Sequence, residues 1–188
     1  MKVGVVGAGN IGASVAKKLA RAGHDLVIAN SRGPETLPDL DGVAKGTLDE
    51  AVEGRDVTFL AVPWVALDAV TAGRDWAGKI VVDTSNPILP GFVFADIGDR
   101  PSSAIVAEKV PGARLVKGFN TLSPERLERD ARTVIFLSGD HPEATKVVAE
   151  LVESAGWAAI DLGSLEVGGR LQQYPGGPFP GLSLVQQD

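Results

Sequence analysis

The sequence predicts an α/β fold: a doubly wound, mostly parallel Rossmann-type sheet with helices on both faces. The first observation is a series of short, nearly continuous apolar runs, which are typical of strands buried on both faces of a parallel sheet. The second is that helical patterns and turns separate these runs, as in βαβ units. We expect strands at residues 3–6, 26–29, 57–62, 80–83, 115–118, 134–137 and 157–162.

Helix signals lie between the expected strands. Residues 11–22 carry apolar side chains at helical spacing and are followed by a glycine, which indicates a helix end. Thr47 and Glu50 have the spacing of a capping box, which predicts a helix start. Two further helices are expected, one opening at residues 123–124 and one opening at residues 140–143 and running to about residue 154.

The length of 188 residues favours one domain with a short extension. We assign residues 1–166 to the sheet domain, including a small substrate-side part, and residues 167–188 to a Gly/Pro-rich C-terminal docking tail. Residues 86–101 form a proline-containing loop long enough to be functional. The apolar end of the tail makes a homodimer a reasonable expectation.

Composition excludes several classes of function. The chain has 24 Asp and Glu against 18 Lys and Arg and lacks a basic stripe with interleaved aromatic residues, so nucleic acid is not an expected partner. It has no cysteine and only two histidines, which removes thiolate chemistry and most metal sites, and we expect no bound metal. No apolar run approaches the roughly 20 residues of a membrane helix, so we expect a soluble, cytoplasmic protein.

A glycine-rich turn directly follows the first expected strand and opens the first helix. There, one glycine allows the tight turn, a second lets the backbone approach a pyrophosphate, and a third allows close packing of helix on strand. The helix amino terminus adds free N–H groups and partial positive charge, which lets an acidic protein bind a polyanion. The predicted dinucleotide-binding residues are Gly7, Ala8, Gly9, Asn10, Ile11 and Gly12.

The end of the second strand indicates which dinucleotide binds. An NAD site usually has Asp or Glu there, accepting hydrogen bonds from the adenosine ribose. This chain has Asn30, Ser31, Arg32 and Gly33 instead. Ser31 can donate to a phosphate oxygen and Arg32 can pair with a 2′-phosphate, so we predict NADP(H) as the cofactor. Glu35 would oppose a phosphate and is expected to face solvent.

Other strand ends supply the rest of the expected site. In this fold, ligands lie beyond the carboxyl ends of the strands, at the point where strand order reverses. The residues after the strand at 57–62 would line and cover the cofactor: Ala61, Val62, Pro63 and Trp64. The polar segments 83–87 and 117–121 end two further strands, and their side chains are expected to converge on the same rim.

Five segments together resemble the NADPH-dependent coenzyme F-420 reductases, also called coenzyme F-420-dependent NADP oxidoreductases. They are Gly-Ala-Gly-Asn-Ile-Gly at 7–12, Asn-Ser-Arg-Gly at 30–33, Val-Pro-Trp at 62–64, Lys-Gly-Phe-Asn-Thr at 117–121 and Asp-Leu-Gly at 161–163. The ferric-reductase domains of certain membrane proteins are relatives of that family. The similarity runs from about residue 1 to residue 166.

The resemblance implies hydride transfer between NADPH and a deazaflavin (coenzyme F-420) or flavin-like acceptor. It would place residues 8–11 on the pyrophosphate, residues 31–32 on the 2′-phosphate, and Val62 and Pro63 beside the nicotinamide ribose. Asn86, Asn120 and Thr121 would flank the nicotinamide and its partner. Because the cofactors carry the chemistry, no side chain is assigned as catalytic.

The chain departs from the family pattern in the 86–101 loop and in its C-terminal tail, where the archaeal enzymes continue with a longer apolar segment. Both departures fall where the second substrate should bind. Two alternatives therefore stay open: reduction of another small acceptor in the same cleft, and a non-catalytic NADP(H) sensor or binding protein. Lys117 as a catalytic lysine of the hydroxyacid dehydrogenase type is disfavoured, because it lies at a strand end without the helical context.

Overall fold

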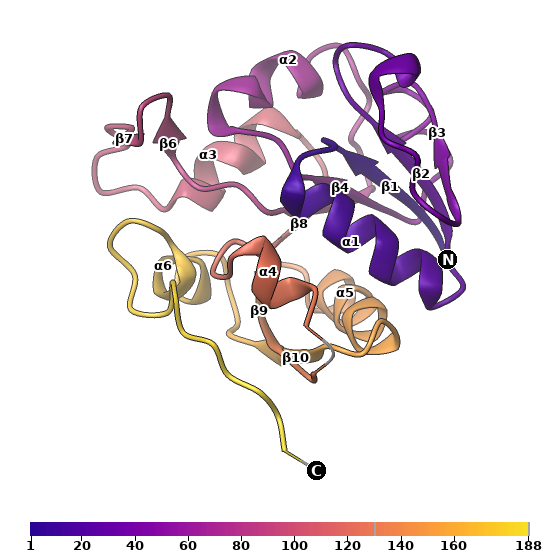
Figure 1. Ribbon diagram of the computed structural model, residues 1–188. Helices are drawn as coiled ribbons and strands as arrows, with labels where there is room; N and C mark the ends of the chain where they lie inside the picture. Colours follow the sequence, from indigo (N-terminus) through magenta and orange to yellow (C-terminus); the bar gives the residue numbers. More distant parts are fainter. Residues whose placement is uncertain (130, 188) are drawn as a thin grey trace.

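One sheet of eight strands organises the chain (Figure 1). The computed structural model describes residues 1–129 and 131–187; the predicted domain and the predicted tail each include one residue, 130 and 188, outside that part. In spatial order the strands are β10 (Ala158–Asp161), β9 (Val134–Gly139), β8 (Arg114–Gly118), β5 (Ile80–Asp83), β4 (Val57–Leu60), β1 (Lys2–Val6), β2 (Asp25–Ala29) and β3 (Val43–Lys45).

The sheet is parallel except at one boundary. β8 pairs antiparallel with β9, and β10 then runs parallel to β9. The interior strands are apolar and buried along nearly their whole length, because helices cover both faces. The prediction of a mostly parallel, doubly wound Rossmann-type sheet is confirmed.

Two hydrophobic cores lie on the two faces of the sheet. On one face, α1 (Asn10–Arg21) and α5 (Pro142–Ser154) pack with α4 (Pro124–Leu127). On the other, α2 (Leu67–Thr71) and α3 (Ser102–Lys109) pack with the buried Trp76. Val5 and Val6, neighbours in β1, belong to different cores because successive strand residues point to opposite faces.

Several sequence predictions need correction at the level of local structure. Thr47 and Glu50 do form reciprocal capping hydrogen bonds, with the Thr47 backbone N–H donating to Glu50 Oε2 at 2.8 Å and the Glu50 N–H to Thr47 Oγ1 at 3.2 Å. The predicted helix is nevertheless absent, since the residues that follow form turns only. Helix α5 begins at Pro142, and its N-cap residue is His141. The side chain of Asp140 does not cap this helix and instead accepts a hydrogen bond from the Leu165 backbone N–H.

Three short strands were not predicted. The edge strand β3 has three residues, and the 86–101 loop contains a small hairpin of β6 (Ile88–Leu89) and β7 (Val93–Phe94). Such short segments carry too few residues for an alternating pattern to be recognised. The hairpin projects from the sheet on the same side of the molecule as α6 (Figure 1).

The C-terminal segment packs against its own subunit. Its first part is helix α6 (Gly168–Gln172), which lies beside β9 and α3. Further on, the Leu184 carbonyl accepts a hydrogen bond of 2.9 Å from the Val134 backbone N–H, and the Gly181 backbone N–H donates to the Thr121 carbonyl. Leu182, Leu184 and Val185 remain 41–49% exposed, so the end of the tail is only partly covered.

Candidate functional site

The glycine-rich turn leaves the amino end of α1 open. Gly9 is the N-cap of α1, and no side chain caps the first turn. The N–H groups of a first helical turn have no partner within the helix, so here they are available to a ligand. Gly7 has φ of 113°, which favours glycine, and its N–H donates to the Ala29 carbonyl at 2.8 Å.

Two glycines of the turn differ in the space around them. A Cβ atom on Gly12 would lie 2.0 Å from the Gly7 carbonyl oxygen, so Gly12 is required for the packing of helix on strand. A Cβ atom on Gly9 would meet no protein atom within 4 Å. The fold therefore does not need glycine at position 9. This open approach to the backbone fits a pyrophosphate, which needs the space above Gly9.

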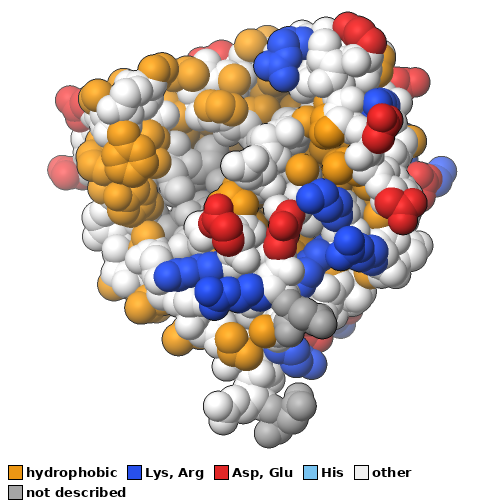
Figure 2. All heavy atoms as spheres, viewed as in Figure 1, with side chains coloured by type: hydrophobic (Ala, Val, Ile, Leu, Met, Phe, Trp, Pro, Cys, Tyr) orange, Lys and Arg blue, Asp and Glu red, His pale blue; other side chains and the backbone are white. Residues whose placement is uncertain are grey.

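A cleft of about 450 Å³ adjoins this turn. It lies beyond the carboxyl ends of β1, β4 and β5, where the chain crosses from one side of β1 to the other, as expected for a ligand site in this topology. Figure 2 shows a hollow in this face of the molecule with hydrophobic side chains along its left rim. The lining residues are Gly9, Asn10, Ile11, Ala61, Val62, Pro63, Trp64, Thr84, Ser85, Asn86, Ile88 and Pro124.

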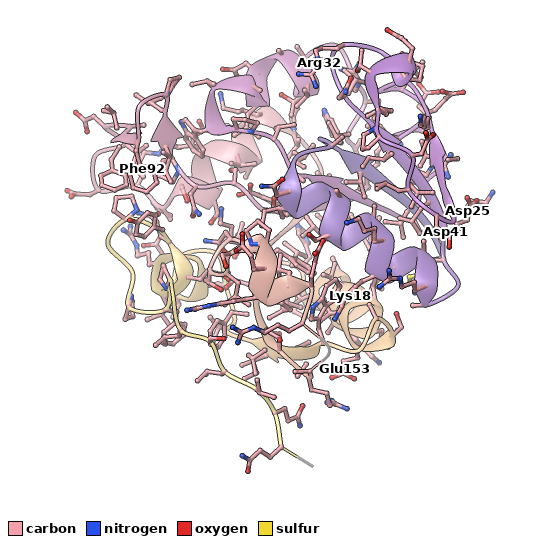
Figure 3. All side chains as sticks on the ribbon, viewed as in Figure 1. Lys18, Asp25, Arg32, Asp41, Phe92 and Glu153 are labelled. Atoms are coloured by element: carbon pink, nitrogen blue, oxygen red, sulfur yellow. The ribbon has the colours of Figure 1, made fainter. Side chains whose placement is uncertain are left out.

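The segment after β2 forms a short loop with two exposed side chains. Asn30 organises the loop, accepting a hydrogen bond of 2.8 Å from the Arg32 backbone N–H and donating to Thr36 Oγ1 at 2.9 Å. Ser31 and Arg32 are exposed, and no ion pair involves Arg32 in the described part of the chain (Figure 3). Gly33 has φ of 100°. Both exposed side chains can therefore meet a phosphate, whereas Asn30 acts within the loop.

Glu35 is exposed, as predicted. Its carboxylate lies close to Gly33, where a Cβ atom would be 2.5 Å from Oε1. The negative charge stays in solvent, where screening weakens its repulsion of an anion.

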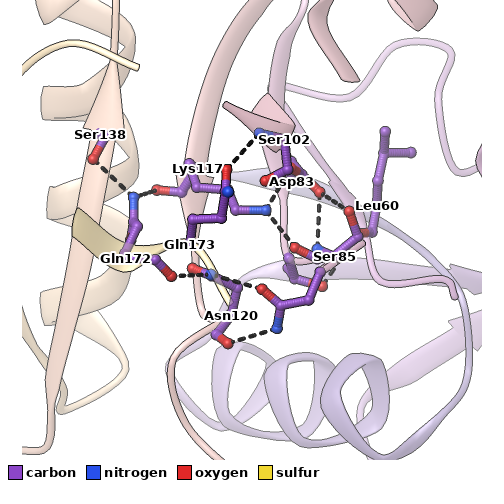
Figure 4. Close-up of polar contacts among 11 residues, drawn as sticks. Leu60, Asp83, Ser85, Ser102, Lys117, Asn120, Ser138, Gln172 and Gln173 are labelled. Atoms are coloured by element: carbon purple, nitrogen blue, oxygen red, sulfur yellow. Dashed lines mark hydrogen bonds and ion pairs between the residues drawn. The ribbon is translucent and has the colours of Figure 1, made fainter. Parts of the chain in front are cut away.

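The polar ends of β5 and β8 meet beside the cleft (Figure 4). Asn86 is half-buried and lines the cleft, while Asn120 and Thr121 are buried behind it, 7% and 6% exposed. Asn86 Nδ2 donates to the Asn120 carbonyl at 2.9 Å, and Asn120 Nδ2 donates to Asn86 Oδ1 at 3.0 Å. The predicted convergence of these two segments is therefore found, and the direct contact of Asn120 and Thr121 with a ligand stays a prediction.

Asp83 and Lys117 lie beneath this rim. Both side chains are fully buried, and Lys117 Nζ is 2.8 Å from Asp83 Oδ2. Lys117 also donates to the Ser85 carbonyl, while Asp83 Oδ1 accepts from the Ser85 backbone N–H at 2.8 Å and from its hydroxyl at 2.7 Å. The expectation that these two side chains reach the rim is wrong, because their charges neutralise each other inside the protein. Together they fix Ser85, which does line the cleft.

Gln172 of α6 was missed by sequence reasoning. It is fully buried, and its Nε2 donates to Ser138 Oγ at 2.8 Å and to the Lys117 carbonyl at 3.3 Å. The backbone carbonyl of Gln172 accepts a hydrogen bond of 2.6 Å from Asn120 Nδ2. A polar side chain in a Gly/Pro-rich tail gives no sign of burial before the fold is known, so no signal in the sequence identified it.

A second hollow, of about 530 Å³, lies at the other end of α1. It is lined by Lys18, Arg21 and Arg132, together with residues 154–156 at the end of α5. The hollow lies at the carboxyl ends of α1 and α5, where the helix dipoles place partial negative charge that opposes an anion. The first turn of α1 has no capping side chain and its dipole favours an anion, so the amino end of α1 is the better candidate for the dinucleotide phosphates.

The described residues contain no cluster of three or more His, Asp or Glu that could hold a metal ion. Among the helices of the described part, none is long and apolar enough to cross a membrane.

Comparison with known proteins gives a consistent result. Residues 2–87, which include the glycine-rich turn and Asn86, match the family described as "NADP oxidoreductase coenzyme F420-dependent". The chain is 31% identical over 180 residues to metalloreductase STEAP3 of Rattus norvegicus, an alignment that covers 93% of this chain and 36% of the relative. The chain thus spans about a third of the length of the metalloreductases it matches.

Two solved structures extend the comparison over the whole fold. A hypothetical protein, SMa0349 of Sinorhizobium meliloti, is 41% identical with a TM-score of 0.92, covering 100% of this chain and 97% of that one. A protein of Arthrobacter sp. FB24, provisionally described as an F420-dependent NADP reductase, is 26% identical with a TM-score of 0.77, covering 88% of this chain and 86% of that one.

Proposed function

The chain belongs to the coenzyme F-420-dependent NADP oxidoreductase family, and from this premise we propose that it transfers a hydride between NADP(H) and a deazaflavin or flavin-like acceptor. The observation that carries the proposal is the cleft itself. It is lined both by the open turn at Gly9 and by a polar wall of Thr84, Ser85 and Asn86. A dinucleotide whose pyrophosphate lies on the turn would extend its nicotinamide toward that wall.

The residues present fit NADP(H). The free N–H groups at the start of α1 would hold the pyrophosphate, while exposed Ser31 and Arg32 would hold the 2′-phosphate. Val62 and Pro63 would lie beside the nicotinamide ribose, with Trp64 covering the cofactor. When bound, NADPH supplies a hydride, becoming NADP⁺ as the acceptor gains that hydride and a proton from water.

The protein's own contribution is alignment. Asn86, fixed by Asn120, gives the nicotinamide end of the cleft a polar wall of defined orientation. Ile88 and Pro124 contribute apolar surface to the cleft, which would help to exclude water around a bound cofactor. Holding two rings in a reactive geometry accounts for a large part of the rate enhancement in such reactions. No side chain is assigned as acid or base.

The test is a panel of acceptors. Purified protein is mixed with NADPH or NADH, and nicotinamide oxidation is followed with coenzyme F-420, FMN, FAD and a ferric chelate in parallel. The proposal expects NADPH oxidation with a deazaflavin or flavin. The ferric chelate is included because relatives carry the name metalloreductase, and its reduction without a ring acceptor would favour the alternative of another small acceptor.

Tight NADPH binding without oxidation by any acceptor would instead favour a non-catalytic sensor.

A cytoplasmic location and a homodimer belong to the same proposal. The half-exposed Leu182, Leu184 and Val185 support the homodimer, because apolar side chains at the end of a chain are often covered by a neighbouring subunit. Light scattering on the purified chain tests it directly.

A further inference from the structure

We infer that Phe92, Phe94 and Tyr174 form an aromatic platform on which the tricyclic ring of the hydride acceptor binds. The inference rests on the proposed function, because it names residues that would select the acceptor. These three side chains come from the two segments that depart from the family pattern, the 86–101 loop and the C-terminal tail.

The three rings form one cluster. The ring centroids of Phe94 and Tyr174 are 5.5 Å apart, those of Phe92 and Phe94 are 5.8 Å apart, and those of Phe92 and Tyr174 are 6.4 Å apart. Their interplanar angles are 84°, 61° and 54°, so no two rings stack face to face. Each such contact covers at most one face of one ring, and Phe92 is 66% exposed, so ring surface remains for a further ring.

The cluster is exposed to an unusual degree for aromatic side chains. Phe92 is 66% exposed and Phe94 is 42% exposed, while Tyr174 is half-buried. Phe92 also has φ of 63°, a conformation that is costly for a bulky residue. A strained, exposed aromatic residue gains nothing from core packing, so its presence is better explained by a ligand.

The register of the hairpin places Phe94 beside a residue that lines the cleft. Phe94 of β7 lies directly opposite Ile88 of β6, and Ile88 lines the cleft. Residues directly opposite each other in an antiparallel pair have side chains on the same face. Phe94 therefore continues the apolar wall that Ile88 begins. In Figure 2 the hydrophobic side chains on the left border the hollow, and Figure 3 shows Phe92 on the hairpin.

The chain that leads to Tyr174 is connected to the cleft wall by a separate route. The carbonyl of Gln172, two positions earlier, accepts a hydrogen bond from Asn120, which in turn is paired with Asn86 of the cleft wall. Gln173 Oε1 accepts a hydrogen bond of 2.7 Å from the Ser102 backbone N–H. The two residues immediately before Tyr174 are thus anchored, one to Asn120 and the other to Ser102.

The chemistry of the platform favours a planar aromatic acceptor. Such a ring, stacked on aromatic side chains at the Asn86 end of the cleft, would lie beside a nicotinamide held against that wall. A hydrated ferric chelate or a small carbonyl compound has no large flat apolar face and would gain little from three aromatic rings. Deazaflavin and flavin share the tricyclic ring, and separate titrations distinguish them.

The experiment measures ring binding directly, apart from turnover. Wild-type protein saturated with NADP⁺ is titrated against coenzyme F-420 and, separately, FMN, following the fluorescence of the ring. The variants are Phe92→Leu, Phe94→Leu and Tyr174→Leu, which keep apolar volume and remove the ring face. Tyr174→Phe keeps the ring and should bind as wild type. Ile160→Ala, a change at a 40% exposed apolar residue on β10, is the matched control.

The inference expects each leucine variant to bind the ring about tenfold more weakly, while NADP⁺ affinity and the Ile160→Ala control stay within about twofold of wild type. Ring binding by wild type without hydride transfer would contradict the proposed function but not this inference. Absence of ring binding by wild type, or unchanged binding in all three leucine variants, would overturn it. A variant that alters only the oligomeric state in light scattering would also overturn it, since the cluster would then join two copies.

Discussion

Asn86 and Asn120 hold each other through two hydrogen bonds, with each side-chain amide donating to the other residue. Asn86 follows β5 and Asn120 follows β8, so the pair joins the ends of two adjacent parallel strands. Only Asn86 lines the cleft. Asn120 also donates to the Gln172 carbonyl, which couples the cleft wall to α6. The orientation of the wall thus depends on residues distant from one another in the sequence.

Asn86→Ala should impair hydride transfer more than cofactor binding. The variant removes the polar side chain at the proposed nicotinamide end and leaves the proposed phosphate contacts at Gly9 and Arg32 unchanged. We expect the single-turnover rate to fall about tenfold and the NADPH Kd to change less than about threefold. Stopped-flow absorbance and equilibrium titration measure the two quantities. A larger loss of NADPH affinity than of single-turnover rate would mean that Asn86 acts mainly in binding the cofactor before the reaction.

Arg32→Ala should weaken NADPH binding selectively. Loss of a charge-assisted pair with the 2′-phosphate costs about 1.5–3 kcal/mol, which corresponds to roughly 10- to 150-fold in Kd. NADH lacks that phosphate, so its affinity should be unchanged. Calorimetric titration with both dinucleotides provides the measurement, and Arg21→Ala, at the opposite end of α1, is the control. Equal loss for NADPH and NADH would contradict the assigned role.

Gly9→Ala and Gly12→Ala should separate binding from stability. A Cβ atom at position 9 meets no protein atom within 4 Å, and the backbone there has an ordinary φ of −74°. We therefore expect near wild-type Tm with at least about tenfold weaker NADPH binding. At position 12 the Cβ atom would lie 2.0 Å from the Gly7 oxygen, which should cost about 1–3 kcal/mol or more of stability.

Thermal unfolding and NADPH titration of both glycine variants check this pair. Unchanged NADPH affinity in a folded Gly9→Ala variant would show that the dinucleotide does not approach this turn. Unchanged stability of Gly12→Ala would show that helix α1 can move away from β1 at little cost.

Lys117→Met should be strongly destabilising. It leaves Asp83 as an uncompensated buried charge, and breaking a buried pair in this way costs about 3–5 kcal/mol. Adding Asp83→Asn to Lys117→Met removes that charge and keeps a side-chain oxygen that can accept hydrogen bonds from Ser85. The double variant should therefore be destabilised by less than the sum of the two single variants, with a coupling above about 1 kcal/mol. Urea unfolding of wild type, the two single variants and the double variant gives a double-mutant cycle. Additive losses of stability would argue against an interaction between Lys117 and Asp83.

Most of the sheet could be predicted because its strands are buried on both faces and are therefore mostly apolar, as in β4 and β5. The reversal at β9 could not be seen in those runs. A parallel connection from β8 needs a crossover of a dozen or more residues, usually an α-helix. The only helix in the described part of that connection is the four-residue α4, so the chain returns antiparallel.

The candidate site was predictable where backbone geometry alone defines it, as at the turn of Gly7 and Gly12, whose glycines are needed for conformation and close packing. The buried state of Lys117 could not be predicted, because it depends on Asp83 occupying the register position beside it in β5. The aromatic platform was also hidden, since Phe94 and Tyr174 are separated by most of the second half of the chain and meet only in the folded protein.

Glu128 predicts a specific acid sensitivity. Its Oε1 accepts hydrogen bonds from Ser14 Oγ at 2.9 Å and Lys17 Nζ at 3.2 Å, joining α4 to α1. These contacts, the Ser14 hydroxyl first, hold the pKa of Glu128 below the ordinary glutamate value of 4.5. The folded state then binds the proton less readily than the unfolded state, so the stabilisation is complete above pH 4.5 and is lost as the pH falls toward the folded-state pKa.

Glu128→Gln removes this titration, so we expect the variant to be less stable than wild type at neutral pH and the difference to shrink as the pH falls below 4.5. Urea midpoints measured from neutral to acidic pH test it, because the other carboxylates titrate in both proteins and cancel in the difference. Glu153→Gln, at an exposed position on α5, should give a curve parallel to that of wild type. A parallel curve for Glu128→Gln as well would mean that the Ser14 and Lys17 contacts do not persist in solution. Pro124 of α4 lines the cleft, so loss of these contacts in acid should also weaken NADPH binding.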